Sequence, residues 1–278
     1  MESDNYIKIA RTIERQLGCK IYIVGGYVRD KILKLKSVDL DFVVERDGLP
    51  VAENLYKKLG GKLTVYRKFL TASLKLENNF VIDIATARIE KYPKPASMPV
   101  IQPAKLEQDL FRRDFTINAL AIRLPSTVYR LPSIIDLCGG LNDIKHNLIR
   151  VLHKKSFTDD PTRILRALRY AVRFNFKIEK NTEKWMNEAI KKNLLKLVSA
   201  PRIRDEFVKT LSEKKAKKIL TEFKKRKILK HIDAKLDISA ISDKKESVSA
   251  RLKKLLKNFT EEQKKSFLKK LCLPAKIS

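Results

Sequence analysis

Two aspartates near the start of the chain have the spacing of a cation site. Asp39 and Asp41 are separated by one residue in the run VDLDFVV, whose apolar residues predict a β-strand. Because side chains alternate along a strand, both carboxylates point to one face and Val38, Leu40 and Phe42 point to the other. Two neighbouring carboxylates repel one another unless a cation lies between them. The spacing therefore predicts a Mg²⁺ site on this strand.

A glycine pair precedes the acids at the end of another predicted strand. Residues 21–24, IYIV, are apolar, and Gly25 and Gly26 permit a tight turn with close approach of the backbone to a ligand. A helix then opens near Tyr27, so that free N–H groups and Arg29 would face a polyphosphate. The alternative is a packing unit in which the glycines form a turn and the acids are solvated, since each motif alone is common.

The surrounding elements that must position this site read as a small sheet with flanking helices. Apolar residues at helical spacing predict helices over residues 5–17 and 49–59, and residues 62–86 supply three short strands with a turn at ENN. Asp83 lies on the third of these strands and could face either solvent or the acid pair. An α+β domain is therefore expected through about residue 150.

Residues 88–109 lose this periodicity and contain four of the ten prolines. A segment of this kind inside a compact domain is usually a functional or a disordered loop. The run DLFRRDFTINALAI follows directly at residues 109–122, and its Arg112–Arg113 pair could be a solvated basic dipeptide.

A second stretch with possible chemistry is the predicted helix over residues 157–176. At 100° per residue its apolar side chains gather on one side, and Asp160 and four arginines gather on the other. Asp160 and Arg163, three residues apart, would be neighbours that offer an acceptor and a fork of donors to the pairing edge of a nucleobase. The four arginines are Arg163, Arg166, Arg169 and Arg173. The alternative is that this side of the helix is an ordinary solvated face.

These motifs together resemble a known family. GGYVRD followed by DLD, then RRDFTINALA, then DDPTR, resembles the nucleotidyltransferase superfamily that includes DNA polymerase beta, and in detail the bacterial-type (class II) tRNA nucleotidyltransferases and poly(A) polymerases. The resemblance covers residues 20–212. It implies a mixed-sheet, palm-like catalytic head at 1–150, an all-α neck at 151–212 and a Lys-rich helical body at 213–278.

The resemblance also implies roles for individual residues. Asp39, Asp41 and, on the later strand, Asp83 would be catalytic, with Asp39 and Asp41 holding the metals of a two-Mg²⁺ site. One of Arg112 and Arg113 would contact the triphosphate, and the first acid of DDPTR is Asp159 where the family has Glu. Arg202 and Arg204 in SAPRIRDEFVKTL are interpreted as solvated more readily than as supporting the site. The expected nucleotide-binding residues are Gly25, Gly26, Arg29, Arg112, Arg113, Asp114, Asn118, Asp160, Arg163, Arg166 and Arg169.

Charge and cysteine content narrow the class of protein. The chain carries 61 Lys and Arg against 32 Asp and Glu, a net charge of +29, which favours a polyanionic partner, although a Lys-rich proteome could produce the same balance. Three distant cysteines indicate neither a disulfide framework nor a zinc site. With no long apolar run, a cytoplasmic protein with no membrane contact is expected.

The implied reaction is the template-independent addition of nucleotides of the terminal CCA to the 3′ end of tRNA, from CTP and ATP. Members that add only CC, only the terminal A, or poly(A) share nearly the same motifs, so these products stay open. The chain is shorter than a usual bacterial member, which implies a reduced region for gripping the tRNA elbow. Two other classes of protein agree less well with the sequence. A transferase that acts on a small molecule or a protein would not need the DDPTR motif or the high positive charge. A catalytically inactive RNA-binding module would have lost one of the acids, and none is missing.

Overall fold

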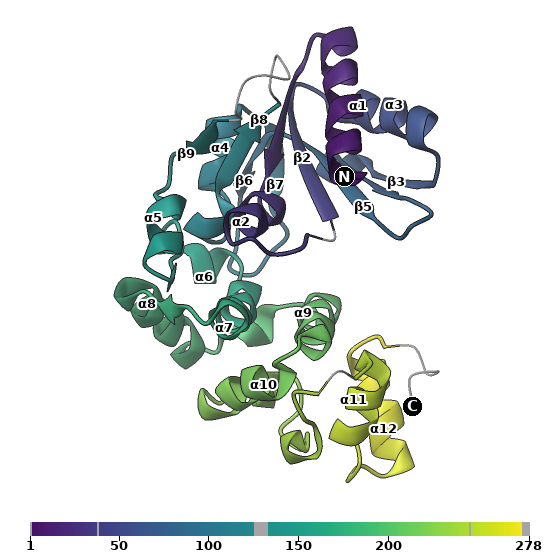
Figure 1. Ribbon diagram of the computed structural model, residues 1–278. Helices are drawn as coiled ribbons and strands as arrows, with labels where there is room; N and C mark the ends of the chain where they lie inside the picture. The colour runs from purple at the N-terminus through teal and green to yellow at the C-terminus, as the bar shows by residue number, and fades with distance from the viewer. Residues whose placement is uncertain (1, 38, 125–132, 245, 274–278) are drawn as a thin grey trace. The chain divides into compact units, whose positions relative to one another are not determined.

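The computed structural model describes residues 2–37, 39–124, 133–244 and 246–273 (Figure 1). Val38, expected on the apolar face of its strand, lies outside the described residues. The chain forms two compact units, one of residues 1–91 and 99–146 and the other of residues 92–98 and 147–278. Among the described residues, no helix combines the length and the apolar character needed to cross a membrane.

A seven-stranded mixed sheet forms the framework of the first unit. Only the neighbours β2 and β5 run parallel, and the other pairs in this sheet are antiparallel. The strand order is β3 (Lys62–Tyr66), β4 (Thr71–Lys75), β5 (Val81–Thr86), β2 (Asp39–Glu45), β1 (Lys20–Val24), β8 (Leu120–Arg123) and β9 (Ile134–Asp136).

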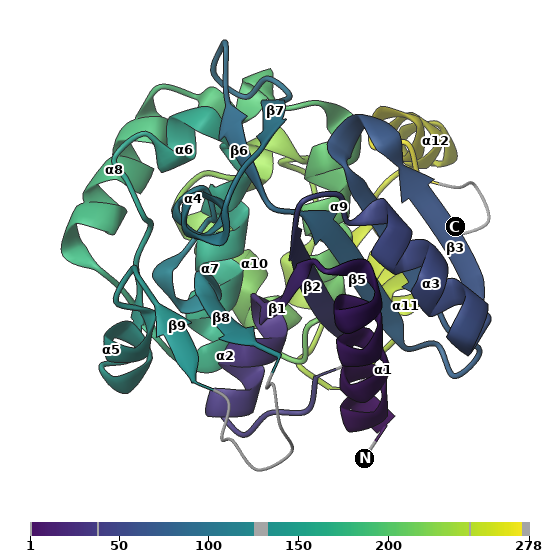
Figure 2. The same cartoon turned by 90° about the horizontal axis from the view of Figure 1, so that it is seen from above.

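Helices cover both faces of this sheet. Figures 1 and 2 place the sheet between α4 (Leu106–Phe111) on one side and α1 (Glu2–Leu17) with α3 (Leu49–Leu59) on the other. Helix α3 packs across β3, β4 and β5, and α1 packs on β1 and α3. Leu40 and Phe42 are at most 1% exposed, as expected for the apolar side of β2. The predicted helices and strands of residues 5–86 are therefore confirmed.

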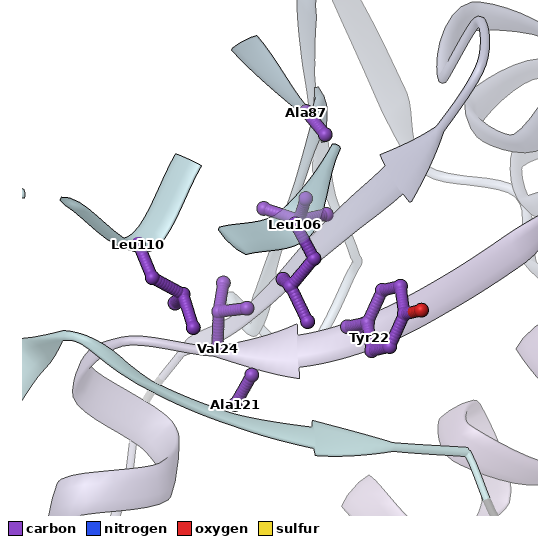
Figure 3. Close-up of a cluster of buried hydrophobic side chains, with 7 residues drawn as sticks. Tyr22, Val24, Ala87, Leu106, Leu110 and Ala121 are labelled. Atoms are coloured by element: carbon purple, nitrogen blue, oxygen red, sulfur yellow. The ribbon is translucent and has the colours of Figure 1, made fainter. Parts of the chain in front are cut away.

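Helix α4 covers part of the sheet face that also carries the acids. Its Leu106 and Leu110 pack on Tyr22 and Val24 of β1, as Figure 3 shows. The carboxylate of Glu45, at the end of β2, accepts a hydrogen bond of 3.0 Å from the N–H of Leu106 and so fixes where the helix begins. The cluster also includes Val43, Ala87 and Ala121.

The expectation of an irregular loop over residues 88–109 was wrong. Residues 88–91 (β6, Arg88–Lys91) and 100–103 (β7, Val100–Pro103) form an antiparallel pair, and α4 follows. Each strand has only four residues, and three of the four prolines lie in the connection between them. Short exposed strands have too few alternations to stand out from the proline-rich segment that joins them.

In its described residues, the second unit is helical apart from one short parallel pair, β10 (Leu148–Ile149) and β11 (Lys177–Ile178). Strand β11 lies within the neck that was expected to be all-α. The α+β class with a mixed-sheet head followed by helices is confirmed. The first unit also holds α2 (Gly26–Ile32) and α5 (Gly140–Lys145). The helices of the second unit are α6 (Ser156–Asp159), α7 (Thr162–Phe174), α8 (Lys180–Lys191), α9 (Ala200–Ser212), α10 (Ala216–Lys225), α11 (Val248–Leu255) and α12 (Glu261–Lys270).

Candidate active site

Three carboxylates lie on one face of the sheet at the junction of β2 and β5. Asp41 is directly opposite Asp83 in the parallel β2–β5 pair, and Asp39 lies two residues before Asp41 on the same side of β2. The same face continues into Val43, which belongs to the cluster beneath α4. Asp39 and Asp83 are exposed and Asp41 is partly buried. The acids therefore occupy the part of the face that the helix leaves open.

Burial and neighbouring negative charge perturb Asp41. Its pKa is raised to about 7, chiefly by burial and then by the charges of Asp39 and Asp83. The guanidinium of Arg113, and more weakly that of Arg29, opposes this rise in pKa. A carboxylate that is costly to ionise without a counter-charge is one that a bound cation would stabilise.

The donor set fits a divalent cation that shares its coordination with a substrate. Within the described ranges, no three His, Cys, Asp or Glu side chains form a group able to hold a metal ion by themselves. Mg²⁺ is commonly held by one or two carboxylates together with phosphate oxygens and water. Asp39 and Asp41, on one side of β2, are two carboxylates of the kind that such a site needs.

Gly25 brings the backbone against this acid pair. Its φ of +70° lies in the left-handed region, and a Cβ at this position would be 3.0 Å from Nη1 of Arg113 and 3.3 Å from Oδ2 of Asp41. A side chain would therefore fill the space between the guanidinium and the carboxylate. Gly26 begins α2, as expected, and lies beside the guanidinium of Arg29.

The two arginines of RRDF have different partners. Arg113 binds Oδ2 of Asp109 through Nη2 at 2.9 Å and through Nε at 3.2 Å, and its Nη1 lies on the Gly25 side. Arg112 binds Oδ1 of the same Asp109, at 2.7 Å from Nη2, and reaches Glu90 of β6 with Nη1 at 2.9 Å. Of the pair, Arg113 is therefore the arginine beside the acids.

Arg29 and Asn118 form a buried connection behind this surface. Arg29 is 4% exposed and binds Asp30 through Nε at 2.8 Å, and its Nη1 donates to Oδ1 of Asn118. The amide nitrogen of Asn118 donates in turn to Oδ1 of Asp114 at 3.1 Å. These contacts join α2 to the RRDFTINALA segment, and they hold the guanidinium of Arg29 within the protein interior.

The residues expected to select the base lie in the second unit. Asp160 is not on the helix: α6 ends at Asp159, Asp160 is extended (φ −134°, ψ 94°), and α7 begins at Thr162 after Pro161. The expectation that Asp160 and Arg163 lie one turn apart on one helix was therefore wrong. Since the residue before a proline is driven out of the helical region, the break falls at Asp160. Both residues still adjoin the same helix start, where the N–H of Arg163 donates to the carbonyl of Asp160 at 3.1 Å.

The arginines of α7 are less solvated than their spacing suggests. Arg163 and Arg169 are each 5% exposed. Arg163 donates from Nη1 to the hydroxyl of Ser156 at 2.6 Å, and Arg169 donates from Nη2 to Glu206 of α9 at 2.8 Å. Arg166 is partly buried. The interpretation of this side of the helix as an ordinary solvated face does not hold for Arg163 and Arg169.

Sequence reasoning overlooked Asp109, and its interpretation of Arg202 as a solvated residue was wrong. Asp109 holds Arg113, and Arg202 donates to Oδ1 of Asp160 at 2.7 Å. A signal for Asp109 was present, because it precedes Arg112 and Arg113 by three and four residues, the spacing of neighbours on a helix. No local signal connects Arg202 to Asp160, since the two are 42 residues apart.

Comparison with known proteins gives matches over both units. Residues 21–150 match the Poly A polymerase head domain, and residues 175–235 match the probable RNA and SrmB-binding site of polymerase A. An A-adding tRNA nucleotidyltransferase of Aquifex aeolicus is 43% identical over 213 residues, which make up 77% of this chain and 26% of that protein. A CCA-adding enzyme of Lactobacillus helveticus is 35% identical over 222 residues, 74% of this chain and 50% of that protein.

A solved structure extends the similarity to almost the whole chain. A tRNA nucleotidyltransferase complexed with a primer tRNA and an incoming ATP analog has a TM-score of 0.77 and 33% identity, and the match covers 96% of this chain and 81% of that one. The chain spans between a quarter and a half of the Aquifex and Lactobacillus proteins. Its motifs, its sheet and these matches agree, and the chain belongs to the family of bacterial-type tRNA nucleotidyltransferases and poly(A) polymerases.

Proposed function

We propose that this protein adds nucleotides of the terminal CCA to the 3′ end of tRNA, taking them from CTP and ATP without a nucleic-acid template. One observation carries the proposal. Asp39 and Asp41 occupy the open end of a sheet face, and Gly25 and Arg113 adjoin Asp41. Carboxylates, a backbone segment that a phosphate can approach closely, and a guanidinium are the groups that position a metal-bound triphosphate.

The residues of the first unit would divide the work of phosphoryl transfer. Asp39 and Asp41, with Asp83 beside them, would hold Mg²⁺ next to the triphosphate. Two Mg²⁺ ions bound there would supply activation of that hydroxyl and neutralise charge that develops in line. Gly25 leaves room for phosphate oxygens, and Arg113 supplies donors to them. Arg112, Arg29, Asp114 and Asn118 would hold this arrangement through their buried contacts.

The second unit would choose the base. A carboxylate accepts the amino hydrogens of cytosine or adenine, and a guanidinium donates to a ring nitrogen or carbonyl, which suits Asp160 and Arg163. Arg166 and Arg169, which follow on the same helix, would also belong to the nucleotide-binding site. Function would then divide along the chain into phosphoryl transfer at residues 1–150, base selection at 151–212 and RNA contact at 213–278.

A second candidate product is the terminal A alone. It is favoured by the 43% identity to an A-adding tRNA nucleotidyltransferase, compared with 35% to a CCA-adding enzyme. The two products require the same site and differ only in which nucleotide is accepted on which tRNA end.

The test supplies the purified protein with three tRNA transcripts, ending before CCA, after the first C and after CC, and with labelled CTP or ATP. Complete CCA addition requires incorporation on all three. Incorporation of A only on the transcript ending in CC would identify the A-adding product, and long A tracts on any RNA would identify a poly(A) polymerase.

The controls use charge-matched variants. Asp41→Asn should remove incorporation, whereas Glu53→Gln, on the exposed side of α3, should retain it. Equal incorporation by wild type and Asp41→Asn would contradict the proposed catalytic site.

A further inference from the structure

Asp109 is the one buried carboxylate in the described part of the chain that ion-pairs with two consecutive arginines. It is 0% exposed, and each of its oxygens serves a different arginine: Oδ1 accepts from Arg112 and Oδ2 from Arg113. The two arginines hold the pKa of Asp109 below its usual value against the cost of burial. The carboxylate is therefore a charged anchor inside the first unit.

The two arginines bound to Asp109 have different further partners. Arg112 donates to Glu90 and to the carbonyl of Arg88, at 3.1 Å, and both of these residues belong to β6. Arg113 donates to the carbonyl of Asn118 at 3.4 Å and lies next to the space beside Gly25 and Asp41. Of the two arginines, Arg113 is the one that lies beside Asp41.

The geometry of Arg113 separates its anchored edge from its open edge. Asp109 takes the Nε and Nη2 edge of the guanidinium, as a two-point contact that fixes the plane of the group. Nη1 projects from the other edge, towards the position that a Cβ of Gly25 would occupy at 3.0 Å. Asp41 is an acceptor on this side, because its Oδ2 lies 3.3 Å from the same Cβ position and its charge interacts with that of Arg113. An ion pair between Arg113 and Asp41 would compete with a metal-bound triphosphate.

We propose that Asp109 is a positioning residue, which aims Nη1 of Arg113 at the triphosphate and restrains Arg113 from pairing with Asp41. The inference rests on the proposed function, because it assumes that a nucleoside triphosphate occupies the space beside Gly25. It assigns Arg113 to phosphate and Arg112 to the connection with β6, a division that follows from which oxygen of Asp109 each arginine binds.

A double-mutant cycle on the full chain tests this proposal. The readout is the dissociation constant for ATP in the presence of Mg²⁺, measured by titration calorimetry for wild type, Asp109→Asn, Arg113→Gln and the double variant. Asp109→Asn and Arg113→Gln should each weaken ATP binding about 10- to 100-fold, the range expected for a charge-assisted hydrogen bond. In the double variant, Asp109→Asn should add less than a factor of two to the loss from Arg113→Gln.

The outcome that overturns the proposal is additivity. If Asp109→Asn weakens ATP binding by the same factor with and without the Arg113 guanidinium, Asp109 does not act through Arg113. A loss of thermal stability is not a test of this role, because Asp109 also binds Arg112. In the same cycle made with Arg112→Gln, Asp109→Asn should weaken ATP binding by the same factor as it does in the wild type.

A second variant keeps the test decisive if Asp109→Asn does not fold. Arg113→Lys retains the positive charge but cannot make the two-point contact with Asp109, so ATP binding should weaken about tenfold. Wild-type affinity in Arg113→Lys would refute the need for a fixed guanidinium. Arg123→Gln, an exposed arginine on β8, is the matched control and should bind ATP as wild type does. ATP binding without nucleotide transfer by the wild type would defeat the proposed function while the cycle still decides the role of Asp109.

Discussion

Arg202 of α9 holds Asp160 through a hydrogen bond of 2.7 Å from Nη2 to Oδ1. The same oxygen accepts from the N–H and the hydroxyl of Thr162, at 2.9 and 2.6 Å. The second terminal nitrogen of Arg202, Nη1, donates to the carbonyl of Ala96 at 2.7 Å. One oxygen of the carboxylate thus has three donors, and the orientation of Asp160 depends on a helix that begins 40 residues later in the chain.

Arg202→Gln should impair the choice of nucleotide more than the chemistry. Of the three donors to Oδ1 of Asp160, removal of the guanidinium leaves the two from Thr162, so the carboxylate gains freedom to accept the wrong base. The ratio of kcat/KM for the correct over the incorrect nucleotide should fall about tenfold. Steady-state kinetics with ATP and CTP on one tRNA transcript measures this ratio. Arg204→Gln, on the same helix and paired with Asp205 at the surface, is the control; an equal fall in both variants would contradict the role of Arg202.

Gly25→Ala should reduce activity more than backbone strain explains. The added Cβ would lie 3.0 Å from Arg113 and 3.3 Å from Asp41, where the triphosphate is proposed to bind. Gly60→Ala is a matched control, because Gly60 has a φ of +68° and, in the described part of the chain, a Cβ added there would meet no non-neighbouring heavy atom within 4 Å.

Both alanine variants should lose about 1 kcal/mol of folding free energy from the left-handed backbone. Only Gly25→Ala should also lower the nucleotide-transfer rate, by about 100-fold if one transition-state contact is lost. Thermal melts and single-turnover assays separate the two effects. Equal rates for Gly25→Ala and Gly60→Ala would show that the space beside Gly25 is not used.

The pH dependence of stability should report Asp41. Its folded pKa of about 7 lies above the ordinary value of 3.8, so the folded state binds more protons than the unfolded state between these values. The contribution of Asp41 to stability is therefore fully present below about pH 4 and is lost as pH rises through 7. In EDTA, Asp41→Asn should avoid this loss and become more stable relative to wild type by about 1–3 kcal/mol between pH 5 and 8, a range lowered for partial solvent exposure.

Denaturant unfolding at several pH values measures that difference. The matched variant Glu53→Gln, exposed on α3, should show a difference from wild type that does not change over the same range. A flat difference for Asp41→Asn as well would mean that the carboxylate ionises in the folded protein at its ordinary pH.

Neutralising lysines of the second unit should weaken RNA binding in a salt-dependent manner. Lys214, just before α10, and Lys218 and Lys224 within it are exposed. If each contacts a phosphate, the triple Gln variant should reduce the slope of log K against log salt by about 0.7–0.9 per lysine. Filter binding of tRNA between about 50 and 200 mM salt provides the slope. The control changes three exposed lysines of the first unit, Lys57, Lys58 and Lys62, to Gln; an equal change in slope would indicate charge in general and not this surface.

Local periodicity predicted the elements that carry the acids. The alternation of VDLDFVV placed Asp39 and Asp41 opposite Leu40 and Phe42, and the structure agrees. The helix of residues 49–59 matches α3 residue for residue. These segments succeed because burial on one face imposes a period that the sequence carries by itself.

Local patterns were misleading where the environment of a residue comes from distant segments. The alternative of a solvated face on α7 does not hold for Arg169, which is buried and paired with Glu206 of α9. The β6–β7 pair was missed because its register is decided across eight intervening residues rich in proline. Neither effect has a period along the chain.

The sequence by itself determined the kind of chemistry, because residue types at short spacing, two acids on one strand after a glycine pair, limit what a ligand can be. Only the tertiary structure decided which of two adjacent arginines lies beside the acids. Arg112 and Arg113 are chemically identical neighbours, and the difference between them arises from Asp109, whose two oxygens direct one to β6 and the other to Gly25 and Asp41. A packing arrangement of this kind is set by how the helix sits on the sheet, which no local pattern records.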